Sequence, residues 1–408
     1  MKLPNPWRGL RGLPAEVWVV AGATLANRMG TMVLPFLVLY LTQHLGHPAR
    51  TAGLVLTVYG VGGLVSAPVA GRLCDRVGAL RVMQAALLLS GGVLFVFPLV
   101  RGIEAVLGLT LLLALIGEAV RPASLAVLTG SVAPEKRAAA IALNRLAVNL
   151  GMSVGPAVGG FLAMASFPLL FVVDGATSLL AGIGLTLAIR RLGLLRREDR
   201  AAEAGALAGT APGGAMRDGR LMLFLAGFFL LGVVFLQHEG AMAVYLVRDL
   251  GLPPSFYGTL FALNTLVIVA LEVPLNLAMA GWPHRRALVL GALLCAAGFG
   301  ALGLATGPWT VAATVLVWTF GEMVFFPVSA TYVAELAPPG RRGAYMGAYS
   351  MSFGLAFTVG PAAGTAALDR FGAPTLWAAV FAVGLASAAV MAALGRPSPA
   401  LTPVPARR

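Results

Sequence analysis

The chain has 408 residues, of which 59% are hydrophobic and only 11% are charged. A soluble globular domain carries about 25% charged residues, because a surface that faces water must be solvated. This composition excludes an ordinary soluble protein and predicts a surface that faces lipid. The formal net charge of +13 would suggest nucleic-acid binding in a soluble protein, but the arginines are dispersed and form no contiguous basic face with aromatic residues. We therefore expect no nucleic-acid partner.

Apolar runs recur along the whole chain. About 20 apolar residues cross a ~30 Å hydrocarbon core as a helix, and backbone groups in lipid must be satisfied within the helix, so that loops fall only between such runs. In chain order we predict transmembrane helices over residues 15–41, 52–73, 80–100, 104–130, 138–163, 167–189, 220–247, 254–279, 286–305, 308–334, 342–366 and 374–394. The sequence thus predicts an all-α polytopic membrane protein.

The distribution of lysine and arginine predicts the orientation. Most of these residues fall in alternate loops on the side that holds both termini, and the opposite side holds Arg50, Arg101, Arg248 and Arg370. Basic residues collect in cytoplasmic loops. We therefore expect a multi-pass protein of the inner (cytoplasmic) membrane with both termini in the cytoplasm.

The middle of the chain separates two similar halves. Residues 190–219 are polar and rich in arginine, glycine and alanine, which predicts a flexible cytoplasmic linker. Gly117-Glu118 and Gly155-Pro156 recur as Gly321-Glu322 and Gly360-Pro361, at an offset of 204 or 205 residues. Because six predicted helices separate the copies, both halves have the same orientation. We predict two pseudo-symmetric six-helix bundles, residues 1–189 and 220–408, the second ending in a short cytoplasmic tail.

The segment after the second predicted helix contains a spaced glycine, aspartate and arginine pattern. Its residues are Gly71, Asp75, Arg76, Gly78 and Arg81. The pattern resembles the cytoplasmic signature of the major facilitator superfamily, with the departure that Ala79 and Leu80 stand where basic residues are frequent. The resemblance implies a gating contact that latches the two halves, not a substrate site. An ordinary short loop is the alternative.

A glycine and proline motif occupies the fifth predicted helix. Its residues are Gly151, Gly155, Pro156, Gly159 and Gly160. It resembles the antiporter motif of the twelve-helix bacterial drug:proton antiporter family within the superfamily, which implies proton-coupled export. Small residues at intervals of four also let transmembrane helices pack closely, so generic packing is the alternative interpretation.

Charged residues inside the predicted spans are the candidates for function, because each costs ~2.5–3.5 kcal/mol to insert at the centre of a helix. Candidates for binding protons or substrate are Glu118, Arg121, Glu322, Glu239, Glu272, Arg28 and Asp174. Arg145 is a further charge within a span. For Arg145 and Asp174 a structural role is the alternative. Glu239 is either a cavity ligand or a residue at the water interface, and Glu272 is either a proton carrier or the partner of a distant arginine.

Glu118, Arg121 and Glu322 are the strongest of these candidates. Glu118 and Arg121 are three residues apart, which places them on one helix face where they can pair. Glu118 and Glu322 are equivalent in the repeat, so we expect both to face a central cavity, where carboxylates can load and release protons.

The resemblance implies a secondary active transporter that exports amphipathic or cationic small molecules in exchange for protons by alternating access. We expect a monomer in the lipid bilayer that uses no cofactor or metal and is not an enzyme. The histidines are too scattered in sequence for a metal site: His44, His47, His238 and His284. Two alternatives remain open, an uptake or facilitative carrier for one metabolite and a membrane sensor or lipid-handling protein that transports nothing.

Overall fold

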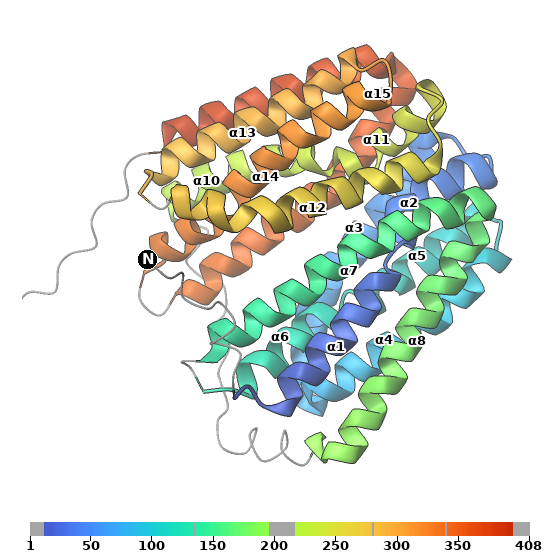
Figure 1. The fold of residues 1–408 in the computed structure, drawn as a ribbon, viewed down its shortest axis with the longest axis vertical. Helices are drawn as coiled ribbons and strands as arrows, with labels where there is room; N and C mark the ends of the chain where they lie inside the picture. The colour runs from blue at the N-terminus through green and yellow to red at the C-terminus, as the bar shows by residue number, and fades with distance from the viewer. Residues whose placement is uncertain (1–11, 134–135, 196–216, 280, 339–340, 395–408) are drawn as a thin grey trace, which may run out of the picture.

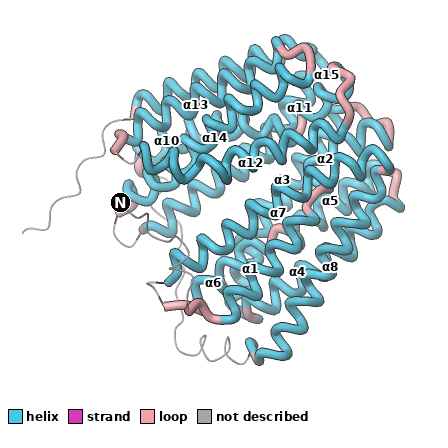
Figure 2. Tube along the Cα trace, in the orientation of Figure 1, coloured by secondary structure: helices cyan, strands magenta, loops and turns pink. Residues whose placement is uncertain are grey.

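The computed structural model describes residues 12–133, 136–195, 217–279, 281–338 and 341–394, and nearly all of them are helical (Figures 1 and 2). The first half of the chain contains α1 (Ala15–Gly30), α2 (Val33–Leu39), α3 (Ala49–Val77), α4 (Ala79–Val96), α5 (Ile103–Gly117), α6 (Val120–Gly130), α7 (Arg137–Ala165) and α8 (Phe167–Leu192). The second half contains α10 (Gly219–Phe235), α11 (Ala241–Val244), α12 (Pro254–Ala278), α13 (His284–Gly300), α14 (Pro308–Leu336) and α15 (Arg342–Ala393).

The described residues contain twelve helices that cross the membrane. Within the described residues, eleven helical stretches are long and apolar enough to do so, and the last of them has 51 residues. A continuous helix of that length would extend about 76 Å, more than twice the ~30 Å hydrocarbon core. It is interrupted at Gly372, whose φ of 78° and ψ of 170° are not helical. α15 therefore comprises two membrane-crossing helices, and the predicted fold class is confirmed.

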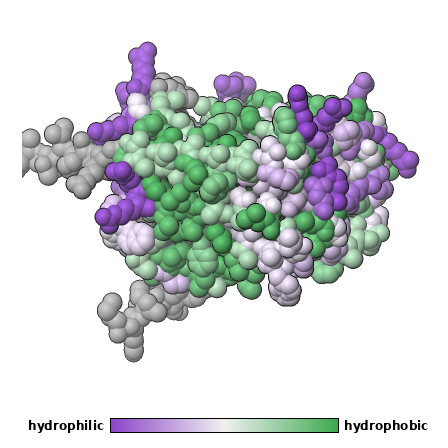
Figure 3. All heavy atoms as spheres, turned by 90° about the horizontal axis from the view of Figure 1, so that it is seen from above, coloured by the Kyte–Doolittle hydropathy of each residue, from purple (hydrophilic) through white to green (hydrophobic). Residues whose placement is uncertain are grey.

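The helices form two bundles, which we call the first bundle (α1–α8) and the second bundle (α10–α15) (Figure 1). One cluster of buried apolar residues lies within the first bundle and another within the second, and a larger cluster joins both. Figure 3 shows an apolar band with hydrophilic side chains gathered at both ends of the molecule. The boundaries 1–189, 190–219 and 220–408 stay a prediction, because most of the predicted linker, residues 196–216, lies outside the described residues.

The bundles contact each other through α3 with α15 and α7 with α12. We call the end where α8 stops and α10 starts the linker end, and the other the opposite end. The α3 face that meets α15 is tight near the opposite end: a Cβ on Gly53 or Gly60 would lie within 3 Å of α15 atoms. Further along α3, a Cβ on Gly71 would have nothing within 4 Å. The contact between the bundles is therefore concentrated at the opposite end.

The first and seventh predicted helices, expected as continuous over 15–41 and 220–247, are both broken. The first leaves helical geometry at Thr31, with ψ 85°, and the seventh at Gly240, with φ −133° and ψ −91°. Pro35 accounts for the first break, because it lacks an N–H group and its ring clashes with a helical carbonyl at Thr31. At Gly240 the absence of a side chain permits close packing on α15, because a Cβ there would lie 3.0 Å from Pro361 Cβ.

Both broken helices end in the same turn. Residues Tyr40–His44 and Tyr245–Asp249 form π-helical turns, and each is followed by a glycine with positive φ, Gly46 at 72° and Gly251 at 65°. The sequences YLTQHLGHP and YLVRDLGLP start 205 residues apart. This is a further copy of the internal repeat, in which only glycine adopts the required φ without strain.

Candidate transport site

Asp174 of α8 caps the break in the first helix. The amides of Met32 and Val33 lack helical acceptors there, and they donate to Asp174 Oδ2 at 3.3 and 3.2 Å. The Asp174 residue is only 7% exposed. The carboxylate thus satisfies two buried backbone donors, which would otherwise carry a large desolvation cost. Of the two interpretations of Asp174, this contact supports the structural role.

The glycine motif of α7 packs against the same break. A Cβ on Gly151 would lie 2.4 Å from Arg28 Cβ, and one on Gly155 would lie 2.8 Å from the Thr31 carbonyl oxygen. Gly160 faces the second bundle instead, where a Cβ would lie 2.8 Å from Ser255 Cα. The motif therefore lets one helix approach both the broken helix of its own bundle and α12 of the other.

Glu118 lies between α5 and α6, and its side chain is held by Tyr59 of α3. The Tyr59 hydroxyl donates to Glu118 Oε1 at 2.8 Å. The predicted pairing with Arg121 does not form within the described residues: Arg121 is exposed and has no ion pair there. The Glu118 carboxylate is instead directed toward α3, where it accepts the hydrogen bond from Tyr59.

The second bundle repeats this arrangement. Asn264 of α12 donates through Nδ2 to Glu322 Oε2 of α14 at 2.9 Å, and to Thr319 Oγ1 at 3.0 Å. Tyr59 and Asn264 are 205 residues apart, and Glu118 and Glu322 are 204 apart. Each bundle thus carries one carboxylate that accepts a hydrogen bond from a neutral donor on the repeat-equivalent helix.

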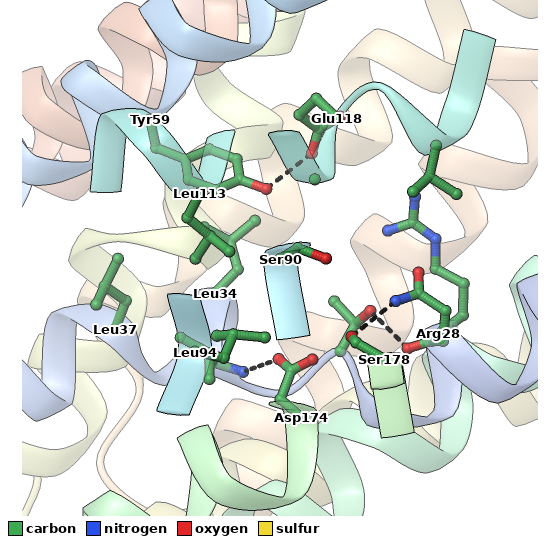
Figure 4. Close-up of a pocket in the computed structure, with 15 residues that line it drawn as sticks. Arg28, Leu34, Leu37, Tyr59, Ser90, Leu94, Leu113, Glu118, Asp174 and Ser178 are labelled. Carbon is green, nitrogen blue, oxygen red and sulfur yellow. Dashed lines mark hydrogen bonds between the residues drawn. The ribbon is translucent and has the colours of Figure 1, made fainter. Parts of the chain in front are cut away.

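The first bundle contains a polar pocket that is lined in part by Tyr59 and Glu118 (Figure 4). Its polar lining residues are Asn27, Arg28, Thr31, Tyr59, Ser90, Glu118, Asp174 and Ser178. Asn27 donates to the Ser178 hydroxyl at 3.0 Å. Figure 4 shows the Arg28 side chain directed toward the part of the pocket that holds Glu118. The structure thus brings together Arg28, Glu118 and Asp174, which the sequence analysis singled out separately.

Glu239 and His238 lie on the short 3₁₀ turn beside the second helix break. His238 Nε2 is 3.4 Å from Glu239 Oε1, and His238 Nδ1 lies 2.6 Å from the Phe235 carbonyl oxygen. Glu239 is 8% exposed, and its Oε2 is buried with no hydrogen-bond partner among the described residues. Of the two predicted positions, the water interface does not fit this burial. The carboxylate lies inside the second bundle.

One ion pair spans the two bundles toward the linker end. Arg145 Nη2 of α7 lies 4.0 Å from Glu272 Oε1 of α12, and the Arg145 side chain is 68% exposed. Of the two sequence-based interpretations of Glu272, the structure supports the charge partner of a distant arginine. Such an exposed and long pair contributes little stability, so it does not hold this end of the molecule closed.

The predicted gating segment lies at the linker end. α3 continues through Gly71, Asp75 and Arg76, and the helix ends at Gly78, where φ is 94°. Arg81 Nη1 donates to the Val77 carbonyl at 2.9 Å. Asp75 is exposed and makes no hydrogen bond to another described residue. Among the described residues, Asp75 therefore does not make the expected latching contact in this conformation, in which the bundles meet mainly at the opposite end.

This arrangement matches a known family along almost the whole chain. Residues 20–247 and 238–408 both match the Major Facilitator Superfamily. The chain belongs to this superfamily. As a major facilitator protein it is a membrane transporter, not an enzyme.

Several bacterial major facilitator proteins are similar to this chain. An uncharacterized MFS-type transporter of Bacillus subtilis strain 168, YqjV, is 25% identical, and the match covers 87% of each chain. A Na(+), Li(+), K(+)/H(+) antiporter of Planococcus maritimus is 23% identical over 84% of this chain and 87% of its own length. The multidrug resistance protein MdtH of Aeromonas hydrophila is 26% identical over 86% and 87%.

Solved major facilitator structures share the fold. The crystal structure of the nucleoside transporter NupG has a TM-score of 0.78 to this structure, with 13% sequence identity, and the match covers 93% of this chain and 99% of that chain. At this identity the likeness establishes the fold alone. The fold and the superfamily expected from the motifs are both confirmed.

Three contacts between polar residues and the candidate acids were not predicted from the sequence. Tyr59 and Asn264 hold Glu118 and Glu322, and His238 lies beside Glu239. The offset of 205 residues between Tyr59 and Asn264 was an available signal, since it equals the offset of the other repeated pairs. The candidates Glu239, Glu272 and Glu322 all lie in the second bundle, apart from the pocket of the first.

Proposed function

We propose that this transporter exports amphipathic or cationic small molecules in exchange for protons, by alternating access between the two bundles. One observation carries the proposal. Glu118 and Glu322 occupy equivalent places in the two bundles, and each accepts a hydrogen bond from a neutral donor, Tyr59 or Asn264. A carboxylate held in this way can bind a proton without breaking an ion pair, whereas an acid neutralised by an arginine would leave a buried cation unpaired.

Two further observations support export. The α7 motif resembles that of drug:proton antiporters, and its glycines pack on the broken helix that lines the pocket and on α12. The similar proteins include one named for multidrug resistance and one named as a cation/H(+) antiporter. We assign the cargo and the coupling to this chain by analogy with those names, together with the placement of its acids.

The proposed orientation follows the arginine bias of the loops. The linker end, with both termini, faces the cytoplasm, and the protein lies as a monomer in the bacterial cytoplasmic membrane. Because the bundles are in contact at the opposite end, the structure then corresponds to an inward-facing conformation. The halves 1–189 and 220–408 act as the two rocking units, joined by the linker 190–219.

Proteoliposomes test the role of the two carboxylates. With an imposed pH gradient and, as cargo, an amphipathic rhodamine that carries both a cationic xanthene and a free benzoate, we expect the wild-type protein to drive movement of the dye with counterflow of protons. Glu118→Gln and Glu322→Gln should each abolish the gradient-driven part, since neither amide can bind a proton. Glu104→Gln, an exposed acid in the first turn of α5, is the matched control. Undiminished proton exchange in both variants would refute the assignment.

A further inference from the structure

Three arginines of the first bundle lie along a path from the linker end to the middle of the membrane. Arg145 is eight residues from the start of α7, Arg121 nine residues from the end of α6, and Arg28 thirteen residues from the start of α1. At 1.5 Å per residue these positions are about 12, 14 and 20 Å from the linker end. A cation at such depth is costly unless a counter-charge or water meets it.

The acids of the same bundle make no ion pair with Arg28 or Arg121 among the described residues, and Asp174 interacts with Arg28 only electrostatically, at longer range. Glu118 accepts from the Tyr59 hydroxyl, and Asp174 accepts from two backbone amides. Among the described residues, neither Arg28 nor Arg121 has a carboxylate within 4.0 Å, and Arg145 reaches Glu272 only at 4.0 Å. The first bundle thus carries guanidinium groups that have no close carboxylate partner among its described residues.

The guanidinium groups lie where a solute could reach them. Arg145 lies between the bundles, since it reaches Glu272 of α12, and both Arg145 and Arg121 interact electrostatically with the Tyr349 hydroxyl of α15. Arg28 lines the pocket of the first bundle, as do Asn27 and Thr31. The three arginines therefore lie at increasing depth between the linker end and the pocket.

The wall contributed by the second bundle is aromatic. Partly exposed rings include Phe235, His238, Phe261, Phe326, Tyr349, Phe353 and Phe357. Many of them contact one another, as Phe326 does with Phe235 at 5.0 Å and with Phe353 at 5.9 Å between ring centroids. Phe357 also approaches Tyr59 of the first bundle, at 6.0 Å. Such rings offer a large apolar surface to a flat or aromatic molecule.

We propose that the cargo carries an oxyanion, a carboxylate, phosphate or sulfonate, which Arg121 and Arg145 attract at the linker end and Arg28 binds in the pocket. The apolar body of the cargo lies against the aromatic wall. Planar guanidinium groups suit this chemistry because they form two parallel hydrogen bonds to an oxyanion. This inference rests on the proposed function and narrows its cargo to amphipathic molecules with an anionic group, alone or beside a cationic centre.

A matched pair of dyes tests the inference. A rhodamine with a free benzoate and its methyl ester share one aromatic body and differ in the oxyanion alone. We would measure binding of each by fluorescence anisotropy to the purified full-length protein in detergent at neutral pH. The free acid should bind at least about tenfold more tightly than the ester. Arg28→Gln and Arg121→Gln should each weaken the acid about tenfold and leave the ester within about twofold.

Two control variants keep the result interpretable. Arg121→Gln alters an exposed side chain without an ion pair among the described residues, so its folding should not change, and Arg28→Lys keeps the charge and should retain part of the preference. Arg370→Gln, an exposed arginine at the opposite end, should change neither affinity. Binding in detergent needs no pH gradient, so a failure of this inference is read separately from a failure of proton coupling. Equal or tighter binding of the ester, no binding of either dye, or an unchanged preference in both glutamine variants would overturn the inference.

Discussion

Single carboxylates in this molecule hold backbone amides that the chain leaves free. Asp218 precedes α10, and its Oδ1 accepts from the amides of Arg220 and Leu221 at 2.9 and 3.3 Å. Its Oδ2 accepts from the Tyr345 hydroxyl at 2.7 Å, which ties the start of α10 to α15. Partial burial alone would raise the pKa of Asp218, but these hydrogen bonds hold the pKa below its ordinary value.

Asp218→Ala should therefore lower the thermal unfolding temperature in a pH-dependent way. A cap of this kind contributes about 1 kcal/mol. Because the folded-state pKa lies below the unfolded value of about 3.9, the contribution is complete above that pH and is lost as the pH falls through the folded-state pKa. Unfolding curves of both proteins between neutral pH and about pH 3 should show a difference that shrinks on acidification. A difference that grows as the pH falls would contradict this account.

Helices in this molecule are positioned by close approach of their backbones. Gly155 of α7 is the sharpest case, because a Cβ there would lie 2.8 Å from the Thr31 carbonyl oxygen and 3.0 Å from that of Arg28. Backbone atoms cannot rotate away as a side chain can. The repeat-equivalent Gly360 packs in the same way on Val233 of the other broken helix. The glycines thus set the position of the broken helix on which the pocket depends.

Gly155→Ala should destabilise the protein and reduce transport. Alanine is favoured over glycine in a helix by up to about 1 kcal/mol, so the sign of the effect depends on the surroundings. Gly92→Ala in α4 is the matched control, because a Cβ there meets nothing within 4 Å. We expect Gly92→Ala to keep or raise the thermal unfolding temperature and Gly155→Ala to lower it. Equal unfolding temperatures for the two variants would show that the close approach has no energetic consequence.

The spans and the duplication could be predicted from sequence, because lipid fixes the length and apolarity of a crossing helix. The helix breaks could not. Proline is tolerated inside α3 at Pro68, α7 at Pro156 and α14 at Pro327 without interruption, whereas Pro35 coincides with a break. What differs is an acceptor from another helix, Asp174, which satisfies the freed amides. Such a partner is known only once the helices are packed.

The same limit applies to the acids. The spacing of Glu118 and Arg121 permits a pair, but it cannot show that a group on another helix competes for the carboxylate. The hydrogen bond from Tyr59 joins residues 59 positions apart, so it depends on how α3 packs against α5. The depth of the acids in the membrane was predictable, and their partners were not.

The whole molecule is closed at one end by contacts between the bundles. A Cβ on Gly60 of α3 would lie 2.7 Å from Thr358 Cα of α15. At the same end Asp369 of α15 accepts from the Arg50 amide at 2.9 Å and from Arg248 Nη1 at 2.8 Å. This closure is a tightly packed interface, so a side chain added to it should shift the balance between conformations by disfavouring one of them.

Gly60→Leu should move the population toward molecules that are open at the opposite end. Spin labels report this as distances, in a background where Cys74 and Cys295 are replaced by alanine. One pair of labels at the opposite end, on Arg101 and Gly307, should move apart. A second pair at the linker end, on Arg76 and Arg285, should come closer, because rocking bundles exchange one opening for the other.

Two comparisons separate this shift from simple loss of packing. Gly92→Leu adds the same side chain where a Cβ has open space, so both distances should stay as in the wild type. Asp369→Asn weakens the acceptor shared by α3 and Arg248 without adding bulk, and it should move both pairs in the same direction as Gly60→Leu, though less. A variant that only loses packing would broaden both distance distributions, without lengthening one mean distance and shortening the other. If Gly60→Leu lengthens both distances together, the bundles do not rock about a common site, and alternating access between them would have to be abandoned.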